Sequence, residues 1–410
     1  MTVTRLPNRF LAILILAANL MSTAAIIGCS NTSQGEAGGA PTATVQDNVG
    51  QLTPEQEEEP QSVVEIELLG LVTFDTGYKS GDTEVGGLSG ITYDPERNIY
   101  YVLSDDRGHV DPARFYSVEI DLSDGKLDDG DIIFLDAIRL KDDESTLFVT
   151  GSIDPEGIEF VSPDRLYISS EGDTGARPLI EPFVNFFNLE GEQIGALPIP
   201  EKFLPDGDGN TGIRDNNAFE SLTSTPDKLV LYTATENALL QDGPQASLAD
   251  GSPSRVIELS LEDQESGREF IYMVDPIPVT PDQTGADADN GLVDLQAVDN
   301  NGTLLAMERS YVEGFGNTVK IFEISLDAAT DVSAIPSLAS RSDTQAPYIP
   351  ISKRLVVDIA DLGIQPDNLE AMAFGPKLPD GRSLLILVSD NNFNPRQTTQ
   401  FIVLALNLES

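Results

Sequence analysis

The sequence predicts an all-β protein that folds as a single β-propeller of about six four-stranded blades. Short runs of Val, Ile, Leu, Tyr and Phe alternate with turns rich in Asp, Gly, Pro and Asn, which is typical of short strands. Few stretches carry the 3.6-residue period of an amphipathic helix. A strand–turn–strand template also recurs five times at intervals of 64 to 76 residues, which suits propeller blades with long loops. A pair of β-sandwiches is the rival architecture.

The first 28 residues have the three parts of a secretory signal peptide. Arg5 and Arg9 give a positive start, and an almost continuous apolar run follows over residues 10–27. The run ends in IIGC, which resembles the lipobox that lipoprotein signal peptidase cleaves. Its length is borderline for a membrane anchor, but Cys29 is the only cysteine and stands where a lipobox needs one. We therefore predict a lipoprotein signal peptide over residues 1–28 and acylation of Cys29.

Residues 29–61 are rich in small and polar residues and have no apolar period, so they are expected to form a flexible tether. Residues 62–410 are the predicted propeller domain. We expect an extracytoplasmic monomer, anchored by its lipid to a bacterial membrane, either at the outer membrane and periplasm or at the cell surface.

The five template copies are the predicted inner hairpins of the blades. They cover residues 88–106, 155–171, 219–236, 295–308 and 369–390. Further strands, expected to lie outside these hairpins, cover residues 113–121, 183–189, 255–261 and 319–325. We expect residues 63–74 and 401–406 to pair in a sixth blade, because joining the two ends closes the ring and protects its edges.

Each template copy begins and ends near an acidic or polar residue. In an antiparallel hairpin the start of the first strand lies beside the end of the second, so these residues should meet in pairs. The expected pairs are Glu156 with Glu171, Glu220 with Glu236, Glu370 with Asp390 and, less strongly, Gln296 with Glu308 and Ser89 with Asp105. All five pairs would then lie at one mouth of the ring. Acidic residues also cap strands and solvate turns, but recurrence in every repeat favours a functional ring.

Carboxylates this close repel one another, and burial adds to the cost. They need protons, arginine partners or bound cations. Ca²⁺ takes six to eight oxygen ligands, so we predict a calcium site with candidate ligands Asp105, Glu156, Glu171, Glu220, Glu236, Glu308, Glu370 and Asp390. Arg107 and Arg309 follow two acidic ends of the template, where they either bind an oxyanionic substrate or pair with the carboxylates.

The charge of the chain limits its partners. The formal net charge is −44, and −46 without the predicted signal peptide. We therefore expect no nucleic-acid partner, and no membrane contact apart from the lipid. A serine-hydrolase triad would depend on His109, the only histidine, which has no Gly-x-Ser-x-Gly motif to accompany it.

Ten short motifs in order resemble the phytase-like family, also labelled "esterase-like activity of phytase". They are GLSGITYD, YYVLSDDRG, DPEGIEF, LYISSEGD, NNAFESLT, LYTATEN, GLVDLQAV, LLAMERS, NLEAMAFG and LILVSDNN. The resemblance runs from about residue 69 to the C-terminus and implies a propeller related to the calcium-dependent alkaline phytases. The resemblance also implies that seven of the carboxylates named above are site residues, with Arg107 and Arg309 in matching positions. These seven are Glu156, Glu171, Glu220, Glu236, Glu308, Glu370 and Asp390. Those phytases also hold phosphates with lysines and arginines, whereas the motifs here contain few lysines.

These observations predict a hydrolase of phosphate esters or carboxylic esters. Calcium would polarise the small-molecule substrate and activate water, and Glu220 or Glu236 would be the general base. Arg107 and Arg309 complete the candidate catalytic set. Two alternatives stay open, a non-catalytic propeller that binds a ligand or partner at the cell surface, and a calcium-dependent lactonase.

Overall fold

Strands make up nearly all of the regular structure in the computed structural model, which describes residues 60–340 and 346–409. These residues belong to one of the chain's two compact units, Glu57–Ser410. The predicted signal peptide, Cys29 and nearly all of the predicted tether lie outside the described residues and stay predictions. Among the residues that are described, no helix has the length and apolar character needed to cross a bilayer.

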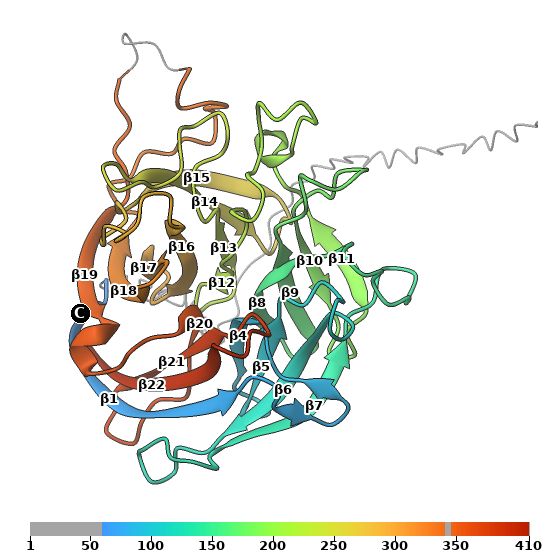
Figure 1. Cartoon of the computed structure of the whole chain (residues 1–410), viewed down its shortest axis with the longest axis vertical. Coiled ribbons are helices and arrows are strands. Elements are labelled where there is room, and N and C mark those ends of the chain that lie inside the picture. Colours follow the sequence, from blue (N-terminus) through green and yellow to red (C-terminus); the bar gives the residue numbers. More distant parts are fainter. Residues whose placement is uncertain (1–59, 341–345, 410) are drawn as a thin grey trace, which may run out of the picture. The chain divides into compact units, whose positions relative to one another are not determined.

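Five four-stranded antiparallel sheets form a propeller within the described residues (Figure 1). The inner strands of blades 1 to 5 are, in order, β4 (Leu88–Asp94), β8 (Pro155–Ser162), β12 (Thr223–Ser224), β16 (Ala288–Ala297) and β20 (Asn368–Phe374). The second strands are β5 (Ile99–Ser104), β9 (Arg165–Ser170), β13 (Val230–Ala234), β17 (Thr303–Val312) and β21 (Ser383–Asp390). The third strands are β6 (Arg114–Ile120), β10 (Phe183–Phe187), β14 (Ser252–Ser260), β18 (Gly316–Ser325) and β22 (Thr398–Glu409). The outermost strands are β7 (Ile132–Arg139), β11 (Gln193–Leu197), β15 (Ser266–Val274), β19 (Ser352–Asp358) and β1 (Ser62–Asp75).

The remaining elements lie in the connections between these strands. They are a two-stranded sheet of β2 (Lys79–Ser80) and β3 (Thr83–Glu84), and two short 3₁₀-helices, η1 (Glu201–Phe203) and η2 (Ile359–Leu362). The inner strands contact one another in a closed circuit from β4 through β8, β12, β16 and β20 back to β4. The all-β propeller is therefore confirmed.

The ring is closed by pairing of the first described strand with the last. β1 lies outermost in blade 5 and pairs antiparallel with β22, from Ser62 opposite Glu409 to Asp75 opposite Thr398 (Figure 1). The predicted pairing of the two ends is confirmed, but the count of about six blades is wrong by one. The two terminal strands complete the fifth blade, because its inner hairpin, β20 and β21, has no other partner strands.

Apolar side chains fill the five spaces between neighbouring blades. One hydrophobic cluster joins blades 1 and 5, and the next joins blades 1 and 2. Val102 belongs to the first cluster, and Leu103, the next residue of β5, belongs to the second. Successive side chains of a strand point to opposite faces of the sheet, so both faces of each blade are buried. This explains why the inner hairpins are rich in continuous apolar runs rather than alternating patterns.

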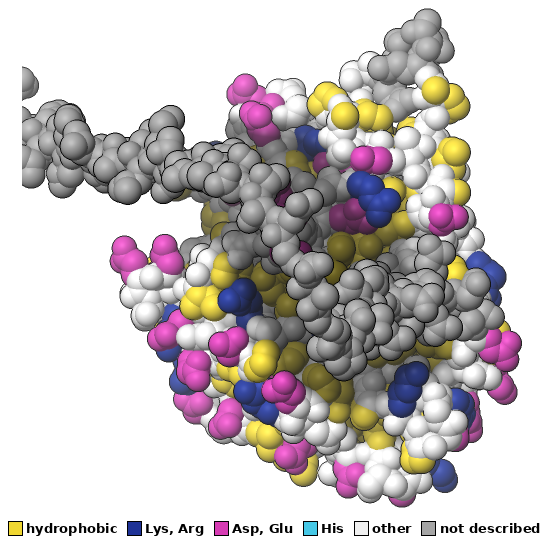
Figure 2. Space-filling view, turned by 180° about the vertical axis from the view of Figure 1, so that it is seen from behind, with side chains coloured by type: hydrophobic (Ala, Val, Ile, Leu, Met, Phe, Trp, Pro, Cys, Tyr) yellow, Lys and Arg dark blue, Asp and Glu magenta, His cyan; other side chains and the backbone are white. Residues whose placement is uncertain are grey.

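Acidic side chains are distributed widely over the outside of the propeller. Figure 2 shows Asp and Glu scattered among Lys and Arg over the described part of one face, without a single concentrated patch there. The surface charge alone therefore points to no binding site on that face.

Candidate functional site

A one-residue register shift occurs in the inner strand of each blade, or just before it in blade 3, close to the acidic residues. In blade 5, Leu369 pairs with Ser389, but Ala371 pairs with Val388, which leaves Glu370 as the extra residue. A bulge re-aims the side chain of the extra residue. The other extra residues are Ser89 in blade 1, Glu156 with Gly157 in blade 2, and Val293 in blade 4. Blade 3 shifts in the same sense between Phe219 and Thr223, around Glu220.

The second strand of each hairpin carries a charged residue near this shift, either within the strand, at its end or one or two residues after it. These residues are Asp105, Glu171, Glu236, Arg309 and Asp390. They interact with Glu156, Glu220 and Glu370 at one end of the ring, which we call the mouth. Here we define the acidic cluster as the eight mutually interacting carboxylates Asp105, Asp154, Glu156, Glu171, Glu220, Glu236, Glu370 and Asp390.

The register of blade 4 differs from the one expected from the sequence. Glu308 pairs with Leu292. Gln296, which was expected opposite Glu308, lies opposite Leu305, three residues earlier in β17. The Glu308 side chain accepts hydrogen bonds from Tyr272 at 2.6 Å and from Asn290 at 3.0 Å, and pairs with Lys353 at 2.6 Å. These contacts place it between blades 3 and 4, outside the acidic cluster. The structure therefore does not place Glu308 with the other predicted metal ligands.

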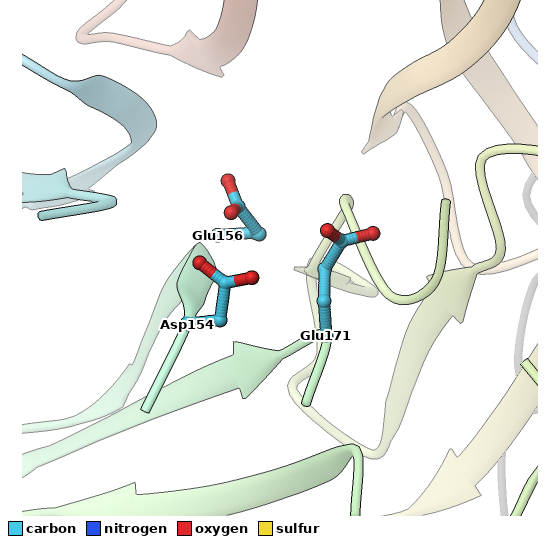
Figure 3. Close-up of side chains that lie close together, drawn as sticks. All are labelled: Asp154, Glu156 and Glu171. Carbon is cyan, nitrogen blue, oxygen red and sulfur yellow. The ribbon is translucent and has the colours of Figure 1, made fainter. Parts of the chain in front are cut away.

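Three carboxylates of blade 2 form the tightest group. Asp154, Glu156 and Glu171 each offer a carboxylate oxygen, and these oxygens lie within 4.8 Å of one another. The three residues are only 3%, 8% and 1% exposed. Figure 3 shows their carboxylates turned toward a common space. The backbone N–H of Ala218 donates to Glu171, and Arg107 forms an ion pair with Asp154.

Burial makes the cluster hold protons more tightly than free carboxylates. Desolvation is the largest cause throughout, and neighbouring carboxylates add to it. It raises the pKa of Asp105, Asp154 and Glu236 to about 7 and the pKa of Glu171 to about 8. The same cause raises the pKa of Glu370, and raises the pKa well above the ordinary value for Glu156, Glu220 and Asp390. A hydrogen bond with Glu171 adds to the increase at Glu220.

Two arginines counter only part of this negative charge. Arg309 pairs with Asp289 at 2.9 Å and Glu370 at 3.2 Å, and lies 3.7 Å from Glu236. Arg107 donates a hydrogen bond to Asn216 at 3.2 Å besides its ion pair with Asp154. Eight carboxylates against two guanidinium groups leave an excess of oxygen ligands at the mouth.

The donor set fits a hard divalent cation. All donors are carboxylate oxygens, and the Asp154, Glu156 and Glu171 oxygens are close enough together to share one ion. Ca²⁺ and Mg²⁺ are bound by such oxygens, and Ca²⁺ accepts the larger and less regular set. A bound cation would also offset the desolvation that raises the pKa values in the cluster.

A pocket of about 920 Å³ opens beside the acidic cluster between blades 4 and 5. Arg309 and Glu370 belong both to the mouth and to the wall of this pocket. Tyr311, Phe315 and Asn392 contribute to its outer wall. A small molecule in the pocket could therefore reach the charged groups of the mouth.

The sequence matches a known protein family over residues 83–393, whose description is "Phytase-like: Esterase-like activity of phytase". The chain belongs to the phytase-like family. No curated protein matches the sequence of this phytase-like propeller. Solved structures that resemble it include the Dos1 propeller, at 10% identity and a TM-score of 0.32, covering 77% of this chain and 67% of that chain. A thermostable family-43 glycoside hydrolase is 11% identical with a TM-score of 0.42, covering 78% and 90%.

Two site residues of the phytase-like propeller are not among the predicted ligands. Asp154 begins the motif DPEGIEF but lies one residue before the blade 2 template, which starts at Pro155. Asp289 belongs to the long β16 strand and meets Arg309 only through the hairpin register. His109, by contrast, lies in an exposed loop between β5 and β6, where its backbone N–H donates to Asp106 at 2.7 Å.

Proposed function

We propose that the protein is a calcium-dependent hydrolase of phosphate esters or carboxylic esters. The observation that carries the proposal is the excess of buried carboxylates at the mouth, next to a pocket of about 920 Å³. Structural ion pairs need no such excess, whereas a cation site does. Membership of a family described by esterase-like activity of phytase supports the same class of reaction.

The residues that would hold the cation are Asp154, Glu156 and Glu171, with further oxygens available from the rest of the acidic cluster. Calcium at this position would polarise the ester and make an attacking water easier to deprotonate. Arg107 neutralises part of the same group through Asp154 and helps to keep it close together.

We assign the role of general base to Glu220. It interacts with Glu171, Glu236 and Glu370 at the centre of the acidic cluster, and a cation bound beside it would favour its ionised form, which is the form that accepts a proton. Glu236 is the second candidate. Arg309 interacts with Glu220, and its Nε is buried without a hydrogen-bond partner among the described residues. This N–H group is available to an oxyanion that develops on the substrate.

The test begins with calcium itself. We expect the purified protein to retain at least one calcium ion and to unfold several degrees lower after treatment with EDTA. A ligand present at 100 times its Kd stabilises the native state by about 2.7 kcal/mol. Absence of both bound calcium and any shift on chelation would remove the metal-centred mechanism.

The second part of the test is a calcium-supplemented screen of phosphate esters, carboxylic esters and lactones. We expect Glu220→Gln to lower kcat by roughly 10²–10⁴-fold. Glu65→Gln, on the exposed side of β1, is the control and should leave kcat unchanged. A calcium-loaded protein that hydrolyses none of these substrates would instead favour the non-catalytic binding module.

A further inference from the structure

The pocket between blades 4 and 5 has a chemistry of its own, distinct from that of the acidic cluster. Eight of its 17 lining residues are Asn or Gln, and five are charged. A carboxamide both donates and accepts hydrogen bonds. An array of carboxamides therefore matches a ligand whose groups do the same, and a neutral hydroxyl group is the simplest such group.

Two polar atoms at this pocket lack a protein partner. Asn317 Oδ1 and Arg309 Nε are buried and have no hydrogen-bond partner within residues 60–340 and 346–409. One is an acceptor and the other a donor. A buried polar atom without a partner costs free energy. A hydroxyl group of a ligand in the pocket could donate to Asn317 Oδ1, while the Arg309 Nε–H remains for the ester itself.

Aromatic side chains form part of the outer wall. Tyr311 is the last but one residue of β17, Phe315 lies in the turn before β18, and they are 37% and 58% exposed. Neither residue belongs to a hydrophobic core cluster, and more than a third of each is exposed to solvent. Exposed aromatic rings beside a polar pocket suit a ligand with an apolar C–H face, such as a sugar ring.

The charges around the pocket argue against a polyanionic ligand. Asp289, Asp367 and Glu370 stand against two arginines, and Arg309 is already paired with two of these carboxylates. Asp367 and Arg396 form no ion pair among the described residues. A ring carrying many phosphates would meet more repulsion than attraction here.

We propose that this pocket binds the alcohol part of the substrate, and that this part is a neutral polyhydroxylated ring such as a sugar bearing a single ester. The proposal rests on the hydrolase function proposed above. In the reaction, the oxygen of water forms a bond to the acyl or phosphoryl group and the ester C–O or P–O bond breaks. The sugar then leaves with a protonated hydroxyl, and the acid retains the oxygen that came from water.

The test compares esters that differ only in their alcohol part. Monoacetylated hexoses and pentoses are paired with ethyl acetate, and hexose monophosphates are paired with ethyl phosphate, with calcium present throughout. We expect the sugar esters to have a higher kcat/KM than the simple esters. Tyr311→Ala and Phe315→Ala should each raise KM for sugar esters about tenfold, with kcat retained and the simple esters unaffected.

Arg396→Gln separates a neutral ligand from an anionic one. We expect it to leave the constants for acetylated sugars unchanged. Two results would overturn the proposal. One is a larger loss of kcat/KM for sugar esters with Arg396→Gln than with Phe315→Ala. The other is an equal kcat/KM for simple and sugar esters that neither aromatic variant changes.

Binding without turnover distinguishes the failure of this inference from the failure of the hydrolase proposal. The free hexoses and pentoses of the same panel are titrated into the calcium-loaded protein and into its Phe315→Ala variant by calorimetry. Sugar binding weakened by Phe315→Ala, with no ester hydrolysed, would retain the pocket and reject the hydrolase. Hydrolysis of simple esters, with no sugar bound, would retain the hydrolase and reject the pocket.

Discussion

Two regions of the propeller bury carboxylates, and they balance the charge in opposite ways. The first is the Arg255 network, which consists of Arg255, Lys202, Asp242 and Glu269. Arg255 pairs with Asp242 at 2.6 Å and with Glu269 at 2.8 Å, and Lys202 pairs with Glu269 at 2.8 Å. The two negative and two positive groups neutralise one another, and their side chains are at most 12% exposed.

The second region, the acidic cluster, has no such balance. Asp390 is 1% exposed, and its carboxylate accepts from the Asn392 N–H at 2.7 Å and the Asn368 amide at 3.4 Å, with no arginine or lysine paired to it among the described residues. The comparison indicates that the fold can satisfy buried carboxylates where their role is structural. At the mouth it leaves them in excess, which is the condition for binding a cation.

The same substitution should therefore have opposite consequences in the two regions. We expect Asp242→Asn to lower the free energy of unfolding by about 3–5 kcal/mol, because Arg255 would lose its main partner inside the protein. Asp390→Asn should have little effect or be stabilising in calcium-free protein, because it removes a charge that burial opposes. Denaturant unfolding of both variants with EDTA present measures the difference, and equal losses would remove the distinction between the regions.

The pH dependence of stability sharpens the comparison. The cluster carboxylates have higher pKa values in the folded than in the unfolded chain, so their contribution is present at low pH and is lost as pH rises. The window begins at about pH 4, the unfolded value, and includes the raised pKa of Glu171, about 8. Calcium-free protein should lose on the order of a few kcal/mol between pH 5.5 and 8.5.

Urea unfolding at a series of pH values measures this loss. Calcium should flatten the plot of unfolding free energy against pH, because it keeps the carboxylates ionised at every pH. Glu171→Gln should also flatten this plot, in this case without calcium. Stability that rises with pH in calcium-free protein would contradict the raised pKa values.

The smallest effect is expected at Arg309, whose positive charge neutralises part of the negative charge at the mouth. Its positive charge lowers the pKa values of Glu236 and Glu370 against the effect of burial. We expect Arg309→Gln to raise both pKa values and to move the pH at which calcium binds upward by roughly one unit. Calcium titrations across pH measure this, with Arg268→Gln as the control at a pair remote from the mouth. An unchanged profile would show that Arg309 does not act on the cation site.

The sequence was sufficient for the hairpins and for most of the acidic residues, because both depend on local pattern. Strand, turn and a terminal acid recur in each blade, and antiparallel pairing then brings the acids together. It was not sufficient for the blade count, since no local signal tells whether 62–75 and 398–409 make a new blade or complete an existing one. Only the ring as a whole decides that.

Blade 4 shows why the register was harder to predict. Its template predicts the polar Gln296 at the mouth, whereas the extra residue of its bulge is the apolar Val293. A shift by an odd number of residues turns each side chain to the other face of the strand. Glu308 therefore points away from the cluster, and Arg309 takes the place at the mouth that a carboxylate occupies in the other blades.

The closure of blade 5 has a mechanical consequence. Ser62 lies opposite Glu409 at one end of the paired strands, so a force that pulls these two residues apart acts on the ladder from that end. Interstrand hydrogen bonds run perpendicular to antiparallel strands, and such a force therefore breaks them one after another rather than all at once. A low force that pulls Ser62 and Glu409 apart should therefore separate β1 from β22, although the same strand pair closes the ring when no force acts.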